Sequence, residues 1–404
     1  MITGTAAAMH AGPAITLSFL LSGVGCVFAG LCYAEFASML PIAGSAYTYS
    51  YATLGEFVAW IIGWDLILEY LFASSTVAVG WSGYMVSFLD DFGIHIPEQL
   101  CLSPIAYSKE AGWFLTGNLI NLPAVLIIVM ISVLLIIGIK ESTRFNNIIV
   151  FVKVAVILLF IGFGASYINV GNWTPYIPEN TGIFGEFGIS GIFTGAGVIF
   201  FAYIGFDAIS TAAQETRNPK RDMPIGILGS LLVCMLLYVA VSAVLTGIVD
   251  YRELNVAAPI AVAIDKTGNA LFWLRPLIKV GAIAGLSSVI LVLLLGQPRI
   301  FYTMARDGLL PKSFSRLHPR FRTPHVTTML TGAVAAIMSG LLPINILGEP
   351  VSIGTLLAFV IVCASVLNLR IRKPEIHRPF KTPWVPFVPV MGMLICLSQM
   401  IALP

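Results

Sequence analysis

The segment FGISGIFTGAGVIFFAYIGFD, residues 187–207, decides how the rest of the chain is interpreted. It is apolar and about long enough to cross a bilayer, which takes about 20 residues. Its first half carries Gly188, Gly191, Gly195 and Gly197, and glycine is the least favourable ordinary helix residue after proline. The pattern therefore predicts a helix that is broken just after the glycines. A second interpretation stays open, because glycines four apart are also typical of close helix packing in membranes.

The composition of the whole chain agrees with this membrane-like segment. Of 404 residues, 58% are hydrophobic and only 10% are charged, and the mean hydropathy is +0.92. Soluble domains carry roughly a quarter charged residues, so a soluble globule and a disordered chain are both excluded. The composition predicts an all-α polytopic membrane protein, with the lipid bilayer as its surroundings.

About ten segments are long and apolar enough to span, and they follow a half-helix at Met1–His10. They are Pro13–Ala34, Phe57–Leu89, Asn118–Ile139, Phe145–Val170, Phe187–Gln214, Met223–Val249, Val280–Pro298, Pro324–Gly348, Pro350–Leu369 and Thr382–Pro404. The order suggests two inverted repeats, residues 1–170 and 187–369, with 382–404 as an additional helix, an arrangement in which the first helix of each repeat is broken.

The distribution of basic residues predicts the orientation. Loops on one side hold 16 of the 22 Lys and Arg residues, and loops on the other side hold four. Positive charge gathers in cytoplasmic loops, so we expect a multi-pass protein of the cell membrane with the basic loops inside. Ser38–Gly55 is then a cytoplasmic linker, and Asp90–Gly117 an outer loop.

Ionisable residues inside spans are costly and mark functional candidates. Lys153 follows Arg144 by nine residues, which places it about 13 Å deep. Lys153 either has a purely structural role, donating to carbonyl oxygens, or gains and loses a proton during turnover. Asp65 and Glu69 share one helix face: we expect Asp65 to pair with a neighbouring helix and Glu69 to face a cavity.

Two further acidic residues are structural or gating candidates. Glu35 ends its span near the cytoplasmic face, where it is expected to accept hydrogen bonds. Asp207 follows the predicted break and could stabilise the start of the next half-helix, because acidic residues favour helix N-termini.

Other classes of function find no support. The 22 basic and 20 acidic residues leave no excess charge for nucleic acid. The five histidines show no metal-ligand spacing, and we expect neither a metal nor a cofactor. The serine motif GxSG occurs at Ser82 and Ser190 without a mid-span histidine as base, so an enzyme is not expected.

Several motifs in order resemble one family. They are CYAEFASMLPIAGSAYTY at 32–49, GWDLILEY at 63–70, FFAYIGFD at 200–207, ETRNPKRDMP at 215–224 and RDGLLP at 306–311. Together they resemble permeases of the amino acid–polyamine–organocation superfamily, most closely the bacterial relatives of the cationic amino acid transporters. The resemblance covers essentially the whole chain and implies a LeuT-like fold, with 5+5 inverted repeats and broken helices 1 and 6.

The resemblance also implies roles for individual residues. Backbone carbonyls of Phe201, Ala202 and Ile204 would hold the ammonium group of an amino acid. Amides of a helix-one segment that ends here at Thr3 and Gly4 would hold its carboxylate.

Lys153 matches the lysine that replaces a sodium ion in the family, and Glu69 matches an acid that meets cationic side chains. The expected function is proton-coupled amino acid import by alternating access. Because the family's segment before Ile2 and its twelfth helix have no counterpart here, the chain is expected to be truncated at both ends. The alternative is a truncated relative that binds or senses amino acids without transporting them.

Overall fold

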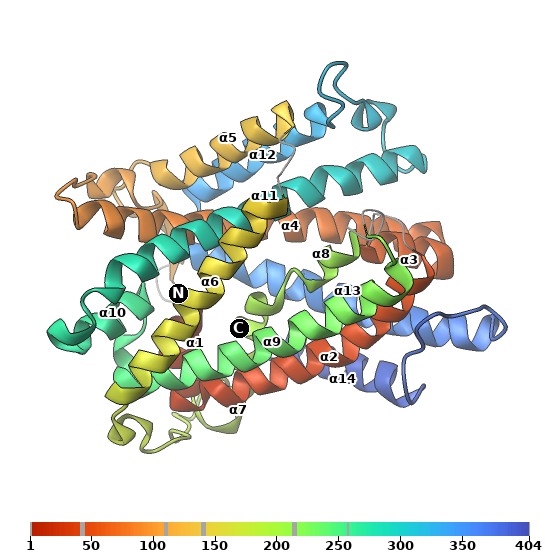
Figure 1. The fold of residues 1–404 in the computed structure, drawn as a ribbon. Coiled ribbons are helices and arrows are strands. Elements are labelled where there is room, and N and C mark those ends of the chain that lie inside the picture. Colours follow the sequence, from red (N-terminus) through yellow and green to blue (C-terminus); the bar gives the residue numbers. More distant parts are fainter. Residues whose placement is uncertain are drawn as a thin grey trace.

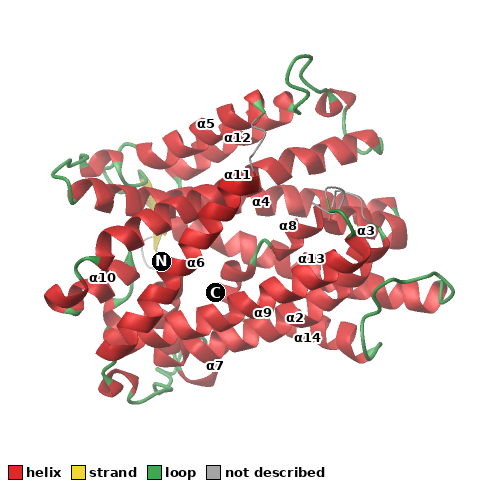
Figure 2. Cartoon of the chain, in the orientation of Figure 1, coloured by secondary structure: helices red, strands yellow, loops and turns green. Residues whose placement is uncertain are grey.

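The computed structural model describes residues 2–40, 45–108, 112–138, 143–211, 216–256 and 258–403. The long helices run side by side in one bundle (Figure 1). Six described helical segments are long and apolar enough to cross a membrane, and four shorter apolar helices accompany them. The loops collect at the ends of the helices (Figure 2), as expected where backbone polar groups must be satisfied inside lipid.

The helices follow one another in chain order. They are α1 (Ile2–Ala6), α2 (Ile15–Met39), α3 (Ser45–Leu54), α4 (Glu56–Asp90), α5 (Leu122–Ile137), α6 (Thr143–Gly164), α7 (Gly188–Ile199), α8 (Phe206–Thr211), α9 (Pro219–Ile248), α10 (Pro259–Lys266), α11 (Leu274–Arg306), α12 (His325–Leu341), α13 (Ile344–Arg372) and α14 (Phe387–Ile401). A π-helical turn, η1 (Ala7–Ala11), extends α1.

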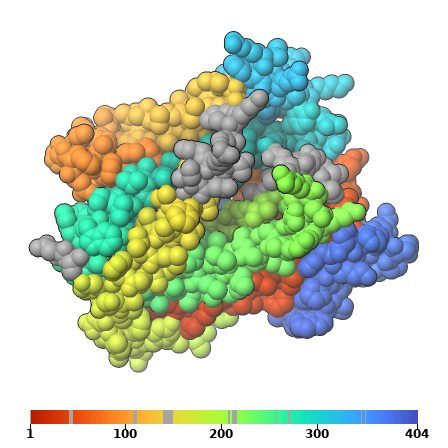
Figure 3. Space-filling model, viewed as in Figure 1, coloured from red at the N-terminus to blue at the C-terminus, as the bar shows by residue number. Residues whose placement is uncertain are grey.

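The helices pack as two groups that share α13. In one group, α4 contacts α5, α11, α12 and α13, and in the other, α2 contacts α7, α9, α13 and α14. Helix α6 contacts both α11 and α9, and in Figure 3 it crosses the visible face between them. The two groups are joined through α13 and α6, and their buried residues belong to one hydrophobic core.

The first turn of the chain depends on a glycine. Gly12 has a φ of +59°, which side-chain-bearing residues rarely adopt, and a methyl group there would overlap Pro178. The chain turns after η1 and enters α2 through Pro13, whose fixed φ suits a helix start. This is the half-helix followed by a full span that Gly12-Pro13 predicts.

The structure adds two short features and moves one predicted boundary. β1 (Ile105–Ser108) and β2 (Gly112–Leu115) pair antiparallel between α4 and α5. The predicted linker at 38–55 contains a helix, α3. The boundary placed between Gly348 and Pro350 lies instead at Leu342 and Pro343, because the extended backbone of Pro343 ends α12, while Pro350 lies inside α13.

Two side-chain hydrogen bonds fix the ends of helices to neighbouring segments. Asn368 donates to the carbonyl of Thr53, and Thr323 donates to that of Ile136. The first bond joins α13 to the end of α3, and the second joins the loop before α12 to the end of α5.

Candidate functional site

The helix at residues 188–211 is interrupted in its middle. Helix α7 ends at Ile199, a 3-10 turn η6 covers Phe200–Tyr203, and α8 begins at Phe206. Ile204 is extended, and Gly205 has a φ of +116°, a conformation that favours glycine. The backbone around Phe201, Ala202 and Ile204 thus leaves the regular helical hydrogen-bonding pattern, as one of the two sequence interpretations predicts.

The glycines before the interruption also serve close packing. A side chain at Gly191 would collide with the carbonyl of His10, and that carbonyl accepts from the amide of Phe187 at 2.8 Å. Gly195 faces Ser18 and Ala11. Both sequence interpretations of this segment therefore describe real features of it.

Two tyrosines hold the interruption in place. The hydroxyl of Tyr203 donates to the carbonyl of Phe19 in α2, and the hydroxyl of Tyr238 in α9 donates to the carbonyl of Ala202, each at 2.8 Å. The two rings lie 5.3 Å apart in an edge-to-face arrangement. A carbonyl oxygen has two acceptor positions, so Ala202 retains one for another donor.

A cavity of about 220 Å³ opens beside this interruption. Its described walls come from η6, α8 and α9: Ala202, Tyr203, Ile204, Gly205, Phe206, Ile209, Ser230, Leu231, Cys234 and Tyr238. We call it the α8–α9 cavity. Of the residues singled out in the sequence, Ala202 and Ile204 line it, and Phe201 precedes them in η6.

The start of the chain packs against a different segment. A methyl group at Gly4 would overlap the carbonyl of Leu254 and touch Pro259, and Thr5 donates to the side chain of Asn255 at 3.0 Å. Thr3 and Gly4 belong to α1, which also contacts α7. The first described residues are therefore held between α7 and the 254–259 segment.

Lys153 lies in α6 and reaches toward α11. Its Nζ donates to the hydroxyl of Ser288 at 2.7 Å, and its stem fills the space that a side chain at Gly285 would need. The contact joins the two helices at a half-buried position. Within the described part of the structure, Lys153 thus donates to a hydroxyl of α11.

Asp65 and Glu69 lie one turn apart on α4, on the side of α13. The exposed fraction of Glu69 is 2%. A methyl group at Gly354 of α13 would lie 2.9 Å from Oδ1 of Asp65 and 3.9 Å from Cβ of Glu69. Neither residue belongs to the described walls of the α8–α9 cavity. Asp207 lies in α8, and its side chain is outside the described part of the structure.

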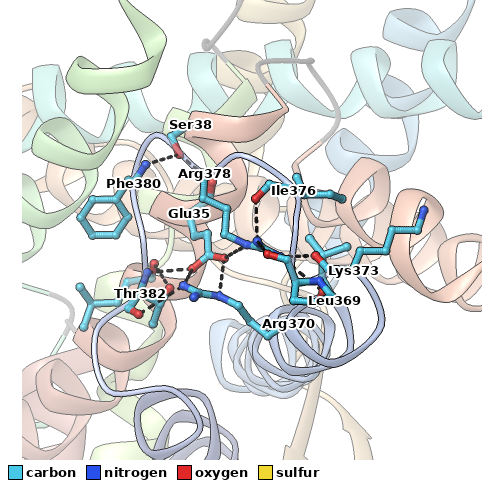
Figure 4. A network of polar contacts seen from close by, with 11 residues as sticks. Glu35, Ser38, Leu369, Arg370, Lys373, Ile376, Arg378, Phe380 and Thr382 are labelled. Carbon is cyan, nitrogen blue, oxygen red and sulfur yellow. Dashed lines mark hydrogen bonds and ion pairs between the residues drawn. The ribbon is translucent and has the colours of Figure 1, made fainter.

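Glu35 is the centre of a charged network at the basic end of the bundle (Figure 4). Its carboxylate accepts two hydrogen bonds from Arg370, one from Arg378 and one from the amide of Thr382, at 2.8–3.1 Å. Arg378 is nearly fully buried and also donates to backbone carbonyls of Leu369, Lys373, Pro374 and Ile376. We call this set the inner network.

A second charged network, which sequence analysis missed, lies at the other end. Lys279 of α11 is fully buried and donates to Asp91 at 2.5 Å and to the carbonyl of Ser87 at 2.7 Å. Arg275 lies 3.7 Å from Asp91 and 3.4 Å from Asp265 of α10. Arg275 and Lys279 are one helical turn apart and share a helix face. This spacing was the sequence signal that could have indicated a charged network here. We call this set the outer network.

The linker helix α3 is fixed to the loop after α11. The hydroxyl of Tyr47 donates to Asp307 at 2.7 Å, and burial together with this hydrogen bond raises the pKa of Tyr47. Next to it, the hydroxyl of Tyr51 donates to Glu56, which raises the pKa of Tyr51. The two motifs at 32–49 and 306–311 therefore meet in the folded chain.

Known proteins resemble this chain over its whole length. The amino acid permease family matches residues 1–404. A methylthioribose transporter of Bacillus subtilis is 47% identical over 404 residues, which are 100% of this chain and 84% of that protein. The branched-chain amino acid permease BcaP of the same organism is 46% identical over 398 residues, 98% of this chain and 82% of that protein.

A plant relative is similar over most of the chain. The vacuolar cationic amino acid transporter 4 of Arabidopsis thaliana is 39% identical over 379 residues, which cover 93% of this chain and 60% of the plant protein. These relatives are transporters and permeases rather than enzymes. With a family match along its full length and apolar helices suited to a bilayer, the chain belongs to the amino acid permease family.

Proposed function

We propose that this protein imports amino acids across the cell membrane by proton-coupled alternating access, on a LeuT-like arrangement of two inverted repeats. The observation that carries the proposal is the interruption between α7 and α8, where irregular backbone lies beside a cavity within a membrane bundle. Such backbone is tolerated at membrane depth where it is buried in protein or lines a cavity, and broken helices form the substrate sites of many secondary transporters.

The substrate ammonium group is proposed to bind the backbone carbonyls of Phe201, Ala202 and Ile204. The Ala202 oxygen is already oriented by Tyr238 at 2.8 Å and has a second acceptor position. The carboxylate is proposed to meet backbone amides near Thr3 and Gly4, because the positive end of a helix favours an anion. The packing of α1 against α7 supports this placement.

Lys153 is proposed to carry the proton. The bond to Ser288 joins α6 to α11, and these helices contact different parts of the bundle. An ammonium group donates three hydrogen bonds, and a neutral amine donates fewer and can accept. Protonation would therefore change the strength of this contact and shift the balance between two access states.

Uptake into proteoliposomes tests the function. We expect an inward-directed proton gradient to drive accumulation of a radiolabelled amino acid without sodium. Lys153→Met preserves much of the length but cannot titrate, so we expect it to exchange amino acid while losing gradient-driven accumulation. Accumulation at the parent level in Lys153→Met, or a strict sodium requirement, would contradict the coupling proposal.

The same preparation separates the alternatives. Binding of an amino acid in detergent without any uptake would favour a sensor over a transporter. Methylthioribose should be tested together with the amino acids, because a relative that is 47% identical to this chain is named a methylthioribose transporter. If methylthioribose alone showed saturable uptake, it would replace amino acids as the proposed substrate.

Glu69 is a proposed contact for cationic side chains, because it is a buried carboxylate on a helix that also carries Asp65. If it touches the substrate, Glu69→Gln should weaken arginine binding by about 1–3 kcal/mol, the range for hydrogen bonds to charged groups. Alanine binding would change little. Equal losses for both amino acids would assign Glu69 to the packing of α4 against α13.

A further inference from the structure

One face of the β1–β2 hairpin is apolar. The two strands pair Ile105 with Leu115 and Tyr107 with Trp113. Partners across an antiparallel pair lie on the same face, and so do residues two apart along one strand. The four side chains therefore share one face of the hairpin, and we call them the hairpin surface.

The folded chain leaves the hairpin surface open. The exposed fraction is 81% for Leu115 and 59% for Trp113, and Tyr107 is exposed as well. The rings of Tyr107 and Trp113 contact each other edge to face, with their centroids 5.4 Å apart. A solvated face of an antiparallel pair ordinarily carries polar side chains. An open apolar face therefore indicates a surface that meets something other than water.

Hydrogen bonds at its base hold the hairpin to the start of α5. The amide of Thr116 donates to the carbonyl of Pro104 at 2.9 Å, and its hydroxyl donates to the carbonyl of Ser103 at 2.7 Å. The amide of Asn121, which precedes α5, donates to the carbonyl of Gly340 in α12 at 3.0 Å. The hairpin is therefore fixed at the end of the bundle where α5 begins.

Helix α5 is short for a helix that crosses a bilayer. Its 16 residues rise about 24 Å at 1.5 Å per residue, whereas the hydrocarbon core is about 30 Å thick. A short span requires the bilayer to thin or flanking residues to contribute. One side of α5 is exposed and apolar, as expected for contact with lipid: Leu122, Leu126, Val129, Met130, Val133 and Ile137.

The sequence decides at which end this apolar band can continue. Beyond Ile137 it soon reaches Lys140 and Glu141, whereas no charged residue occurs between Gly112 and Leu122. Leu119 is exposed between the hairpin and the helix and continues the apolar run. Tryptophan and tyrosine also concentrate where a membrane meets water. The bilayer is therefore the partner that fits this end of α5.

We propose that the hairpin surface lies in the interfacial region of the bilayer and anchors the segment between α4 and α5 to phospholipid. The rings of Tyr107 and Trp113 each combine an apolar body with a polar atom, which suits the boundary between headgroups and acyl chains. This inference depends on the membrane surroundings of the family and on neither the substrate nor the coupling ion. Lys109 and Glu110, which separate the strands in the sequence, fall outside the residues that the structure describes.

Spin labels at single cysteines test the depth of the hairpin in phospholipid vesicles. The background is Cys101→Ser with Cys234→Ser, because the other four cysteines are buried. Leu115→Cys reports on the hairpin surface, and Leu126→Cys reports on the lipid-facing side of α5. Glu98→Cys is the matched control, since it is an exposed position in the same segment. The readout is the ratio of collisions with oxygen, which dissolves in lipid, to collisions with a water-soluble nickel chelate.

We expect this ratio to be several-fold higher for Leu115→Cys than for Glu98→Cys, and highest for Leu126→Cys. Equal ratios for Leu115→Cys and Glu98→Cys would place the hairpin surface in water and overturn the proposal. Dipolar broadening between two labels at Leu115→Cys would show that a second copy of the chain covers the surface, which would overturn it as well. Neither measurement requires transport, so failure of the proposed function would leave the result unchanged.

Tryptophan fluorescence tests the same point without a new cysteine. Trp113 is one of seven tryptophans, so its emission is the difference between the parent protein and Trp113→Phe, which keeps an aromatic ring at the position. We expect phospholipids with brominated acyl chains to quench this difference signal several-fold more than acrylamide in the water does. Quenching by acrylamide alone would overturn the proposal.

Discussion

The inner and outer networks differ in how completely they are enclosed. In each, one carboxylate faces two basic side chains, and the outer network adds a second carboxylate, Asp265. Glu35 is 1% exposed and accepts four hydrogen bonds, whereas the side chain of Asp91 is 31% exposed, with one short bond to Lys279 and a longer approach from Arg275. Water can therefore replace a lost partner more easily at the outer end.

The difference bears on how the ends of the bundle can open. The inner network joins the end of α2 to α13 and to the segment before α14, and Arg378 ties that segment to itself through four backbone carbonyls. The outer network joins α4, α10 and α11 through the fully buried Lys279 and through Asp91, Asp265 and Arg275, whose side chains remain partly accessible. We infer that the inner network stabilises a fixed corner of the fold and that the outer network is easier to rearrange.

The largest expected effect follows from removing Glu35. Glu35→Ala leaves Arg378, whose side chain is 3% exposed, without its counter-charge, and breaking a buried pair costs about 3–5 kcal/mol. Thermal unfolding in detergent should show a large drop in midpoint. Glu35→Gln keeps an acceptor for the amide of Thr382 and should lose less. An unchanged midpoint in Glu35→Ala would show that this network contributes little to stability.

A substitution at Arg378 sharpens the same point. Arg378→Lys retains the charge but loses the planar group that reaches Glu35 and several carbonyls together. We expect Arg378→Lys to lower the thermal unfolding midpoint by most of the amount by which Glu35→Ala lowers it. If lysine restored the parent midpoint, charge alone would explain the inner network, and its many carbonyl bonds would be incidental.

A smaller effect is expected at the outer end. Lys279→Met removes a buried ammonium while Asp91 keeps Arg275 nearby and access to water. The loss should be about 1–3 kcal/mol, as for one hydrogen bond to a charged group. Destabilisation equal to that of Glu35→Ala would remove the contrast between the two ends.

The smallest effect is expected for Arg275→Gln. The side chain of Arg275 is 28% exposed and its ion pairs are long, and exposed pairs contribute about 0–1 kcal/mol. The shift should shrink further when ionic strength rises, because salt screens exposed charges. A large shift that persists in high salt would mean that Arg275 is as enclosed as Arg378.

Apolar length and glycine content were enough to predict a helical membrane protein and the break after Gly197. The boundaries failed where proline was read as a helix end: Pro343 does end a helix, but Pro350 is accommodated within α13. Local sequence could not separate these two cases, because packing around a proline decides whether the helix continues. The hairpin at 105–115 was missed for a related reason, since short strands become stable only through partners.

The sequence predicted only those parts of the candidate site that lie within one continuous segment of the chain. The glycine pattern predicts the break, and the family resemblance implies Phe201, Ala202 and Ile204 as residues beside it. The hydrogen bond from Tyr238 of α9 to the carbonyl of Ala202 was not predicted, because the two residues are 36 positions apart in the sequence. The bond between Lys153 and Ser288 crosses 135 residues, and no local pattern encodes it.

By itself the sequence determined the class of protein and the place where one helix breaks, because hydrophobicity and glycine act locally along the chain. The tertiary structure alone decided which charges pair. It gave Glu35 two arginines from the far end of the chain, gave Lys279 its aspartate, and opened an apolar cavity between α8 and α9. Pairing and cavity shape depend on which distant helices approach one another, and close packing fixes those contacts only once the whole bundle has formed.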